Sequence, residues 1–332
     1  MNPLNVVMLQ GRSRTDRIFT NEHLERIRRF GTLTVNGSDE DPTSALAAKL
    51  AEGADVVITS WGCPPLEAPI LDRCPKLKLV LHAAGTVKPI LSPEILPRGI
   101  RVGTANEALA RGVAETALGL AIASLKNMWQ LARNTREGEW HKQRERVREL
   151  YEVTVGVIGA GLAGRHLIRL LRSFEVRVLV SDPFVSETEV AGMGAVKAEL
   201  DELLRSSDVV SFHAPSVPET DRMMNARTLA LMKDDAILIN TARGSLIDED
   251  ALVAELRKGR LWACLDVTNP EPPEADHPFR SLPNVTLLPH IAGAENNGLR
   301  RIGGFVADEV ERYATGRPLK GEVDIAQLHR LA

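Results

Sequence analysis

The sequence predicts an α/β protein with two doubly wound parallel sheets. Short apolar runs alternate with amphipathic segments through residues 1–105, and the same alternation resumes through 151–290. In addition, a β-branched run that starts at Val153 ends in a glycine-rich turn, which an apolar helix pattern follows. Strands that alternate with helices form parallel sheets covered by helices, since each crossover passes over a face of the sheet. With 332 residues, the chain is long enough for two domains.

The first 105 residues predict a sheet with strands at 5–9, 32–35, 55–59, 77–82 and 100–104. Helices are expected between them at 21–30, 43–52, 66–73 and 92–96. The fourth strand runs into a loop of small residues that contains Ala84, Gly85 and Thr86. Because ligands bind beyond the carboxyl ends of parallel strands, this loop is a candidate substrate site.

One long helix is expected over 106–135, and a polar stretch then leads to the glycine turn. After Asp182 we expect strands at 208–213, 236–240, 262–267 and 285–288, and helices at 248–258 and 297–315. The last helix is expected to return to the first domain. The prediction is therefore a discontinuous domain of residues 1–110 and 296–332, and a second domain of residues 111–295.

Composition limits the classes of function. The chain is 44% hydrophobic and has a formal net charge of −3 without a strong basic stripe, which argues against nucleic acid or a membrane surface as the main partner. Cys63, Cys74 and Cys264 lie far apart in apolar stretches, so neither a metal site nor a disulfide is expected. This cysteine usage fits a reducing cytoplasm, and neither a signal peptide nor a transmembrane span is expected.

The glycine turn predicts a dinucleotide site. Gly159 permits a tight turn, Gly161 lets the backbone approach a pyrophosphate, and Gly164 allows close packing of helix on strand. Asp182 lies 18 residues beyond the last glycine, where a carboxylate accepts hydrogen bonds from ribose hydroxyls and repels a 2′-phosphate. The prediction is a Rossmann domain that binds NAD rather than NADP. A plain βαβ unit without a nucleotide is the alternative.

Four strand ends in the second half carry polar residues beside glycine or proline. They are Ser211 to Pro215, Asn240 to Gly244, Asp266 to Pro273, and Leu287 to Gly293. In an open parallel sheet these ends converge on the crevice that contains the glycine turn. Arg, Glu and His side chains at such a crevice suit 2-oxo acid chemistry, because Arg binds a carboxylate in bidentate fashion and His transfers a proton to a carbonyl oxygen. A neighbouring carboxylate keeps such a histidine charged near neutral pH.

These motifs resemble those of the D-isomer-specific 2-hydroxyacid dehydrogenase family. The similar segments are Gly159 to Gly164, Asn240 to Gly244, Asp266-Val267 through Glu271-Pro272, Pro289-His290, Val113 to Glu115, and His213 through Thr220. They occur in the family's order and spacing, over roughly residues 55–316. The resemblance implies two lobes with the substrate in the cleft between them: a Rossmann NAD-binding domain and a flavodoxin-like substrate domain. It also implies a homodimer, and the chain resembles the family's short form, without a regulatory domain.

The resemblance also implies roles for individual residues. Arg243 would hold the substrate carboxylate and carbonyl, His290 would be the acid/base, and Glu271 would pair with His290. The loop of Ala84, Gly85 and Thr86 would bind the substrate carboxylate through backbone N–H groups. The residues implied at the cofactor are Gly159, Gly161, Leu162, Ala163, Gly164, Asp182, His213, Ala214, Pro215, Thr220, Thr241, Ala242, Arg243, Asp266, His290 and Gly293.

Structural alternatives remain for several of these side chains. Arg243 could be a surface arginine, His290 or His213 a structural histidine, and Asp266 the cap of its strand end. Glu271 lies in a proline-rich turn where an exposed glutamate is common, and Glu274 is its nearest competitor.

The sequence departs from the family pattern after Thr86. Family members usually carry a second glycine and an Asp or Asn there, whereas this chain continues Val87-Lys88-Pro89-Ile90, which could reshape the substrate pocket or add a positive charge to it. The expected function is NAD-dependent interconversion of a 2-oxo acid and a D-2-hydroxy acid. The alternative is a non-catalytic NAD(H)-sensing protein like the corepressors built on this scaffold. A second enzyme alternative within the family is oxidation of a small anion such as formate or phosphite. Formate oxidation is disfavoured, because Glu271 stands where those enzymes carry glutamine.

Overall fold

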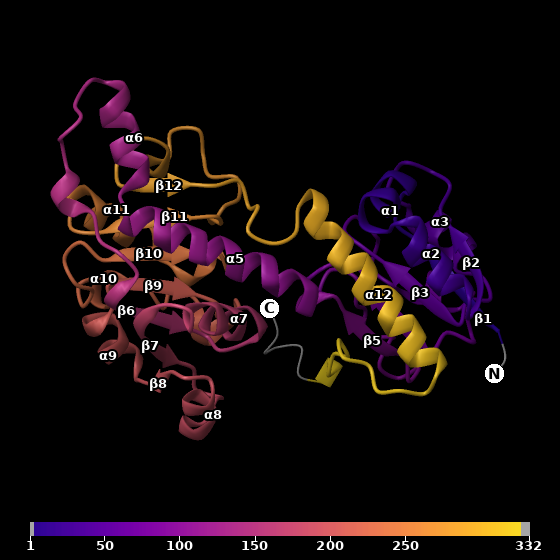
Figure 1. The fold of residues 1–332 in the computed structure, drawn as a ribbon. Coiled ribbons are helices and arrows are strands. Elements are labelled where there is room, and N and C mark those ends of the chain that lie inside the picture. The colour runs from indigo at the N-terminus through magenta and orange to yellow at the C-terminus, as the bar shows by residue number, and fades with distance from the viewer. Residues whose placement is uncertain (1–2, 327–332) are drawn as a thin grey trace. The chain divides into compact units, whose positions relative to one another are not determined.

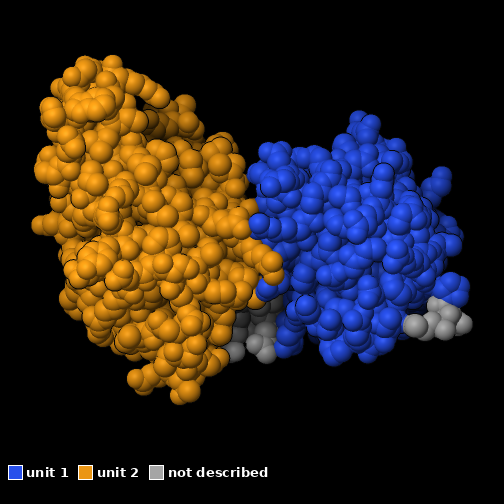
Figure 2. Space-filling view, viewed as in Figure 1, with its two compact units in different colours: residues 1–109, 294–331 blue, residues 110–293, 332 orange. Residues whose placement is uncertain are grey.

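The computed structural model describes residues 3–326, which fall into two compact units. Unit 1 comprises the residues up to 109 together with those from 294 onward, and unit 2 comprises residues 110–293 (Figure 2). Each unit is built on its own parallel sheet (Figure 1).

Unit 1 contains a five-stranded parallel sheet in the order β2-β1-β3-β4-β5. This is the flavodoxin-like order, in which the chain winds outward in both directions from the first strand. Its strands are β1 (Leu4–Met8), β2 (Gly31–Val35), β3 (Val56–Thr59), β4 (Leu79–His82) and β5 (Arg101–Thr104). Its helices are α1 (Arg12–Ile18), α2 (Asn21–Arg28), α3 (Ser44–Leu50), α4 (Ala68–Leu71) and, after unit 2, η5 (Asn296–Gly298) and α12 (Leu299–Ala314).

Two local expectations in unit 1 were wrong. The segment expected as a helix at 92–96 forms turns, because Pro93 and Pro97 interrupt it and Gly99 adopts a positive φ of 64°. Helix α1 was not anticipated, since its sequence RSRTDRI has no apolar periodicity.

Unit 2 contains a seven-stranded parallel sheet in the order β12-β11-β10-β9-β6-β7-β8. Reversed, this is the Rossmann order with one additional strand, so the predicted fold class is confirmed. The strands are β6 (Tyr151–Ile158), β7 (Glu175–Ser181), β8 (Val196–Lys197), β9 (Val209–Phe212), β10 (Ile237–Asn240), β11 (Trp262–Leu265) and β12 (Val285–Leu287). The helices are α6 (Met128–Arg136), η1 (Arg144–Arg146), α7 (Leu162–Leu171), α8 (Glu187–Gly192), α9 (Leu200–Ser206), η2 (Pro218–Thr220), α10 (Ala226–Leu229), η3 (Gly244–Leu246), α11 (Glu249–Arg257) and η4 (Pro278–Arg280).

Helix α5 (Asn106–Leu125) connects the units, and it does not continue to residue 135 as expected. Asn127 adopts a left-handed conformation with φ of 51°, which ends the first helix before α6 starts. By length and composition α5 is apolar enough to cross a membrane. Its residues Ala117, Leu120 and Leu125 nevertheless pack in the core of unit 2.

Both sheets are covered on two faces. Strands β9 and β10 are buried throughout, and their Val- and Ile-rich sequences are typical of strands covered on both sides. Separate apolar clusters lie on the two faces of each sheet. The carboxyl ends of the strands are the places where polar side chains and loops emerge, and the candidate site is built there.

Candidate active site

The glycine turn between β6 and α7 forms a cradle that only glycine permits. Gly159 has φ of 92°, and a Cβ atom there would lie 2.6 Å from the backbone N of Ala214. A Cβ on Gly164 would lie 2.1 Å from the carbonyl oxygen of Gly159. Gly161 is the N-cap of α7, and no side chain caps that helix end. The first N–H groups of α7 are therefore available to a phosphate, as a pyrophosphate site requires.

Asp182 braces this turn from the end of β7. Its carboxylate accepts a hydrogen bond from the N–H of Ala160 at 2.7 Å and another from the N–H of Phe184 at 2.8 Å. Each carboxylate oxygen retains a lone pair that can accept a ribose hydroxyl. Leu162 is 45% exposed at the start of α7, followed by Ala163. The residues of this turn thus fit a dinucleotide.

The loop after β9 contains a histidine that is partly buried, His213. His213 hydrogen-bonds through Nε2 to the Ser211 hydroxyl at 2.9 Å, while its Nδ1 is buried without a partner among the described residues. Burial lowers the pKa of His213 to about 4, so the ring is neutral at physiological pH. In the same loop, the Thr220 hydroxyl donates to the carbonyl of Pro215 at 2.6 Å, which holds the turn after Ala214.

The loop after β10 presents Arg243. Asn240 shapes this loop, because its amide donates to the Arg243 carbonyl at 2.8 Å and accepts from the Ala242 N–H at 3.0 Å. The guanidinium of Arg243 donates to the Ala242 carbonyl at 2.7 Å. Burial lowers the pKa of Arg243, and the negative charge of Glu271 opposes that shift. Beside it, the buried hydroxyl of Thr241 has no partner among the described residues, as expected of a group that faces a ligand.

His290 and Glu271 form a hydrogen-bonded pair. His290 Nδ1 lies 2.5 Å from Glu271 Oε1, and the two side chains are 49% and 42% exposed. Glu274, the competing carboxylate, has no contact with His290 among the described residues, and its backbone carbonyl accepts from Arg280 and from the His277 N–H. Since Nδ1 is bound to the carboxylate, Nε2 is the ring nitrogen left to exchange a proton with a ligand.

Asp266 fixes the backbone that carries His290. Its buried carboxylate accepts from the N–H of Ile291 and from the N–H of Ala292, each at 2.8 Å. The His290 N–H donates to the Asp266 carbonyl at 2.9 Å, and His290 itself adopts φ of 54°. Asp266 therefore positions the loop, and its role is more than the cap of its own strand.

Helix α5 supports the same loop through residues that the sequence did not single out. A Cβ on Gly112 would lie 2.1 Å from the carbonyl oxygen of Gly293. One turn later, the Thr116 hydroxyl donates to the Ala292 carbonyl at 3.3 Å. A glycine inside an otherwise good helix pattern is the signal that could have indicated this close approach.

In unit 1, the loop after β4 exposes backbone donors. The Thr104 hydroxyl is hydrogen-bonded to the carbonyls of Ala84 and Gly85. Within the described part of the chain, the N–H groups of Gly85 and Thr86 have no hydrogen-bond partner. Val87, the first residue that departs from the family pattern, is 4% exposed and packs in the core of unit 1, which anchors the loop. Lys88 is exposed.

Comparison with known proteins identifies the family. Residues 118–292 match the model described as D-isomer specific 2-hydroxyacid dehydrogenase, NAD binding domain. A D-3-phosphoglycerate dehydrogenase of Methanocaldococcus jannaschii is 31% identical over 277 residues, which are 83% of this chain and 52% of that protein. A glyoxylate reductase of Korarchaeum cryptofilum is 30% identical over 88% of this chain and 90% of its own length. The chain belongs to the D-isomer specific 2-hydroxyacid dehydrogenase family.

A solved structure of a phosphoglycerate oxidoreductase from Rhizobium etli superposes on this family member with a TM-score of 0.81. The alignment covers 96% of this chain and 98% of the Rhizobium etli chain, at 26% sequence identity. The chain spans about half the length of the phosphoglycerate dehydrogenases that it matches. The matched model describes an NAD binding domain and ends at residue 292, so NAD is the cofactor of unit 2.

Burial of His213 makes unit 2 acid-sensitive. Its pKa is about 4 in the folded chain, against an ordinary value of 6.5, so the unfolded chain binds the additional proton between these values. Stability is therefore expected to fall as the pH drops from 6.5 toward 4, by about 2 kcal/mol at pH 5 for this residue. Urea unfolding at pH 7 and pH 5 measures the loss, which should be smaller in His213→Asn. Equal losses in His213→Asn and in the control His141→Asn, an exposed position, would contradict this account.

Proposed function

We propose that this protein is an NAD-dependent oxidoreductase that interconverts a 2-oxo acid and a D-2-hydroxy acid. The observation that carries the proposal is the pair of His290 and Glu271, together with the partly buried guanidinium of Arg243, on the domain that matches the NAD binding model. When bound, the nicotinamide supplies the hydride that adds to the carbonyl carbon in the direction of reduction.

The chain's own groups account for the rest of the chemistry. Arg243 binds the substrate carboxylate and carbonyl, where a largely desolvated cation stabilises the negative charge that develops on the oxygen. His290 donates a proton from Nε2 to that oxygen, and recovers it in the reverse reaction. The Glu271 carboxylate accepts a hydrogen bond from the Nδ1–H of His290, which fixes the orientation of the ring.

Unit 1 supplies further donors in this proposal. The N–H groups of Gly85 and Thr86 lack partners among the described residues, and they would bind the substrate carboxylate beside Ala84. The relatives are named for different substrates, among them glyoxylate and hydroxypyruvate, so the proposal covers small 2-oxo acids as a class. Since these relatives are named as reductases and dehydrogenases, they lend no support to the non-catalytic alternative.

The proposal includes a homodimer in a reducing cytoplasm. Met128, Trp129 and Trp140 are 48%, 50% and 67% exposed on and after α6, an apolar surface that a second copy would cover. If the protein is not a dimer, light scattering will give the mass of a monomer. All three cysteines are free and buried, and burial raises the pKa of the Cys63 and Cys74 thiols to about 11, as suits unreactive thiols.

The decisive experiment is NADH oxidation against a panel of 2-oxo acids. The panel contains glyoxylate, hydroxypyruvate, pyruvate, phenylpyruvate, 2-oxoisocaproate and 3-phosphohydroxypyruvate, with NADPH in parallel. We expect turnover with at least one member, and a preference for NADH because Asp182 repels a 2′-phosphate. If NADH binds but no member of the panel is reduced, the proposed activity on 2-oxo acids is wrong and the NAD(H)-sensing alternative is favoured.

Replacement of Arg243 is expected to remove catalysis while the cofactor still binds. Arg243→Ala should lower kcat/KM by about 10²- to 10³-fold, because one charged donor to the developing oxyanion is lost. NADH affinity, measured by fluorescence titration, should change far less. Arg257→Ala on α11 is the control for loss of a positive charge in the same unit. Unimpaired turnover in Arg243→Ala would rule out the assigned role.

Replacement of Glu271 is expected to lower the rate of reduction. In Glu271→Gln the ring of His290 loses its charged hydrogen-bond partner and is held less firmly, so kcat should fall while NADH affinity stays near that of the wild type. Glu274→Gln, in the same proline-rich turn, should leave kcat unchanged. If both variants lower kcat alike, Glu271 has no special relation to His290.

A further inference from the structure

The loop after β4 is held by its carbonyl groups and free at its N–H groups. The Thr104 hydroxyl lies 3.1 Å from the Ala84 carbonyl oxygen and also contacts that of Gly85. In a trans peptide the N–H points opposite to the C=O of the same plane. The carbonyls of Ala84 and Gly85 share their planes with the N–H groups of Gly85 and Thr86. Thr104 is the side chain that holds both carbonyls, while the Ala84 carbonyl also accepts from the Ala105 N–H at 3.2 Å, and this hold directs both loop N–H groups away from Thr104.

Thr104 is in turn held by a segment from the far end of unit 1, residues 318–323. The Thr104 N–H donates to the Gly321 carbonyl at 2.8 Å, and the Val323 N–H donates to the Val102 carbonyl at 2.8 Å. Gly103 and Glu322 form an antiparallel bridge. A Cβ on Gly321 would lie 2.2 Å from the Thr104 carbonyl oxygen, so the segment lies directly against the end of β5.

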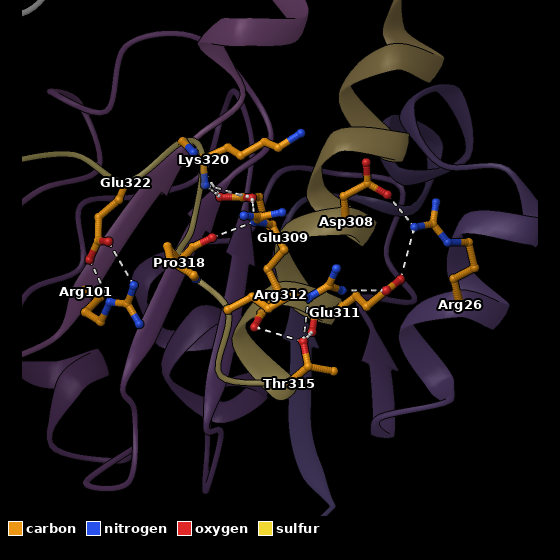
Figure 3. Close-up of polar contacts among 12 residues, drawn as sticks. Arg26, Arg101, Asp308, Glu309, Glu311, Arg312, Thr315, Pro318, Lys320 and Glu322 are labelled. Carbon is orange, nitrogen blue, oxygen red and sulfur yellow. Dashed lines mark hydrogen bonds and ion pairs between the residues drawn. The ribbon is translucent and has the colours of Figure 1, made fainter.

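A buried carboxylate holds this segment in place. Glu309 on α12 is 1% exposed. It accepts hydrogen bonds from the Lys320 N–H at 3.0 Å and the Gly321 N–H at 3.0 Å (Figure 3). The Arg312 guanidinium lies 3.7 Å from the same carboxylate and donates to the Pro318 carbonyl. A charge buried this deeply is costly unless it is fully hydrogen-bonded, and here backbone N–H groups supply two of its bonds.

We propose that Thr104 is a positioning residue for substrate binding, and that Glu309 acts through it by seating the 318–323 segment against β5. The inference rests on the proposed function, because the N–H groups that Thr104 orients are those assigned to the substrate carboxylate. Contacts therefore run from the buried carboxylate through Gly321 and Thr104 to the loop of Ala84 and Gly85. None of these side chains needs to touch the substrate.

The test compares Thr104→Val with Thr104→Ser. Valine keeps the shape and removes the hydroxyl, whereas serine keeps the donor. In Thr104→Val we expect KM for the 2-oxo acid to rise about 3- to 10-fold, the worth of one hydrogen bond, with kcat and NADH affinity near those of the wild type. Thr104→Ser should stay within about twofold of the wild type. Glu309→Gln should raise KM in the same direction.

Arg26→Ala is the matched control, since Arg26 pairs with Asp308 and Glu311 on the same helix but contacts no part of the 318–323 segment in the described structure (Figure 3). It should leave KM unchanged. A second readout independent of activity is hydrogen exchange of a peptide spanning 83–91, which should be faster in Thr104→Val than in Thr104→Ser.

The outcomes separate the inference from the proposed function. If Thr104→Val matches Thr104→Ser in both KM and exchange, the positioning role is wrong. If the wild type turns over no 2-oxo acid while exchange still responds to Thr104→Val, the proposed function is wrong and the hold of Thr104 on the loop stands.

Discussion

Hydrogen bonds from loop backbones to acidic side chains are the constraint on which the rest of the structure depends. Asp266 shows it most directly: both oxygens of its carboxylate bind the two N–H groups that follow His290. Asp182 does the same for the glycine turn, and Glu309 for the segment beside β5. Loop backbones otherwise lose hydrogen bonds when they leave a sheet, so an acidic side chain at a strand end or helix face stabilises one loop conformation. Precise placement of reactive side chains follows from these contacts.

Much of the fold could be predicted because buried parallel strands leave a strong signal. Apolar runs such as those of β9 and β10 locate the sheet, and the glycine turn locates the start of α7. The break at Asn127 could not be predicted, because good helix formers continue on both sides and only the left-handed φ ends the helix. Nor could the turns at 93–99 be separated from a helix by apolar spacing alone, although Pro93 and Pro97 are visible in the sequence.

The candidate site also contains residues that the sequence predicted and residues that it did not. Arg243, Glu271 and His290 were predicted as site residues because their local motifs are specific, and the structure shows the expected contact of His290 with Glu271 rather than with Glu274. Thr104 and Glu309 were missed, since each acts through contacts between residues far apart in the chain. The burial of Val87 could not be predicted, because a loop sequence does not show which side chain turns inward. Its burial explains how a loop without the family's usual second glycine can still be anchored.

Unit 1 is assembled from both sides of unit 2 in the chain, and this has a consequence for synthesis on the ribosome. The ribosome releases the N-terminus first, so all five strands of the unit 1 sheet have been synthesised when α12 is still about two hundred codons away. Until α12 arrives, the apolar face that it covers with Ile302, Val306 and Val310 stays open to solvent. Unit 2 is continuous, so it can finish folding first. Unit 2 must therefore fold while unit 1 is incomplete and an apolar face of unit 1 is still exposed.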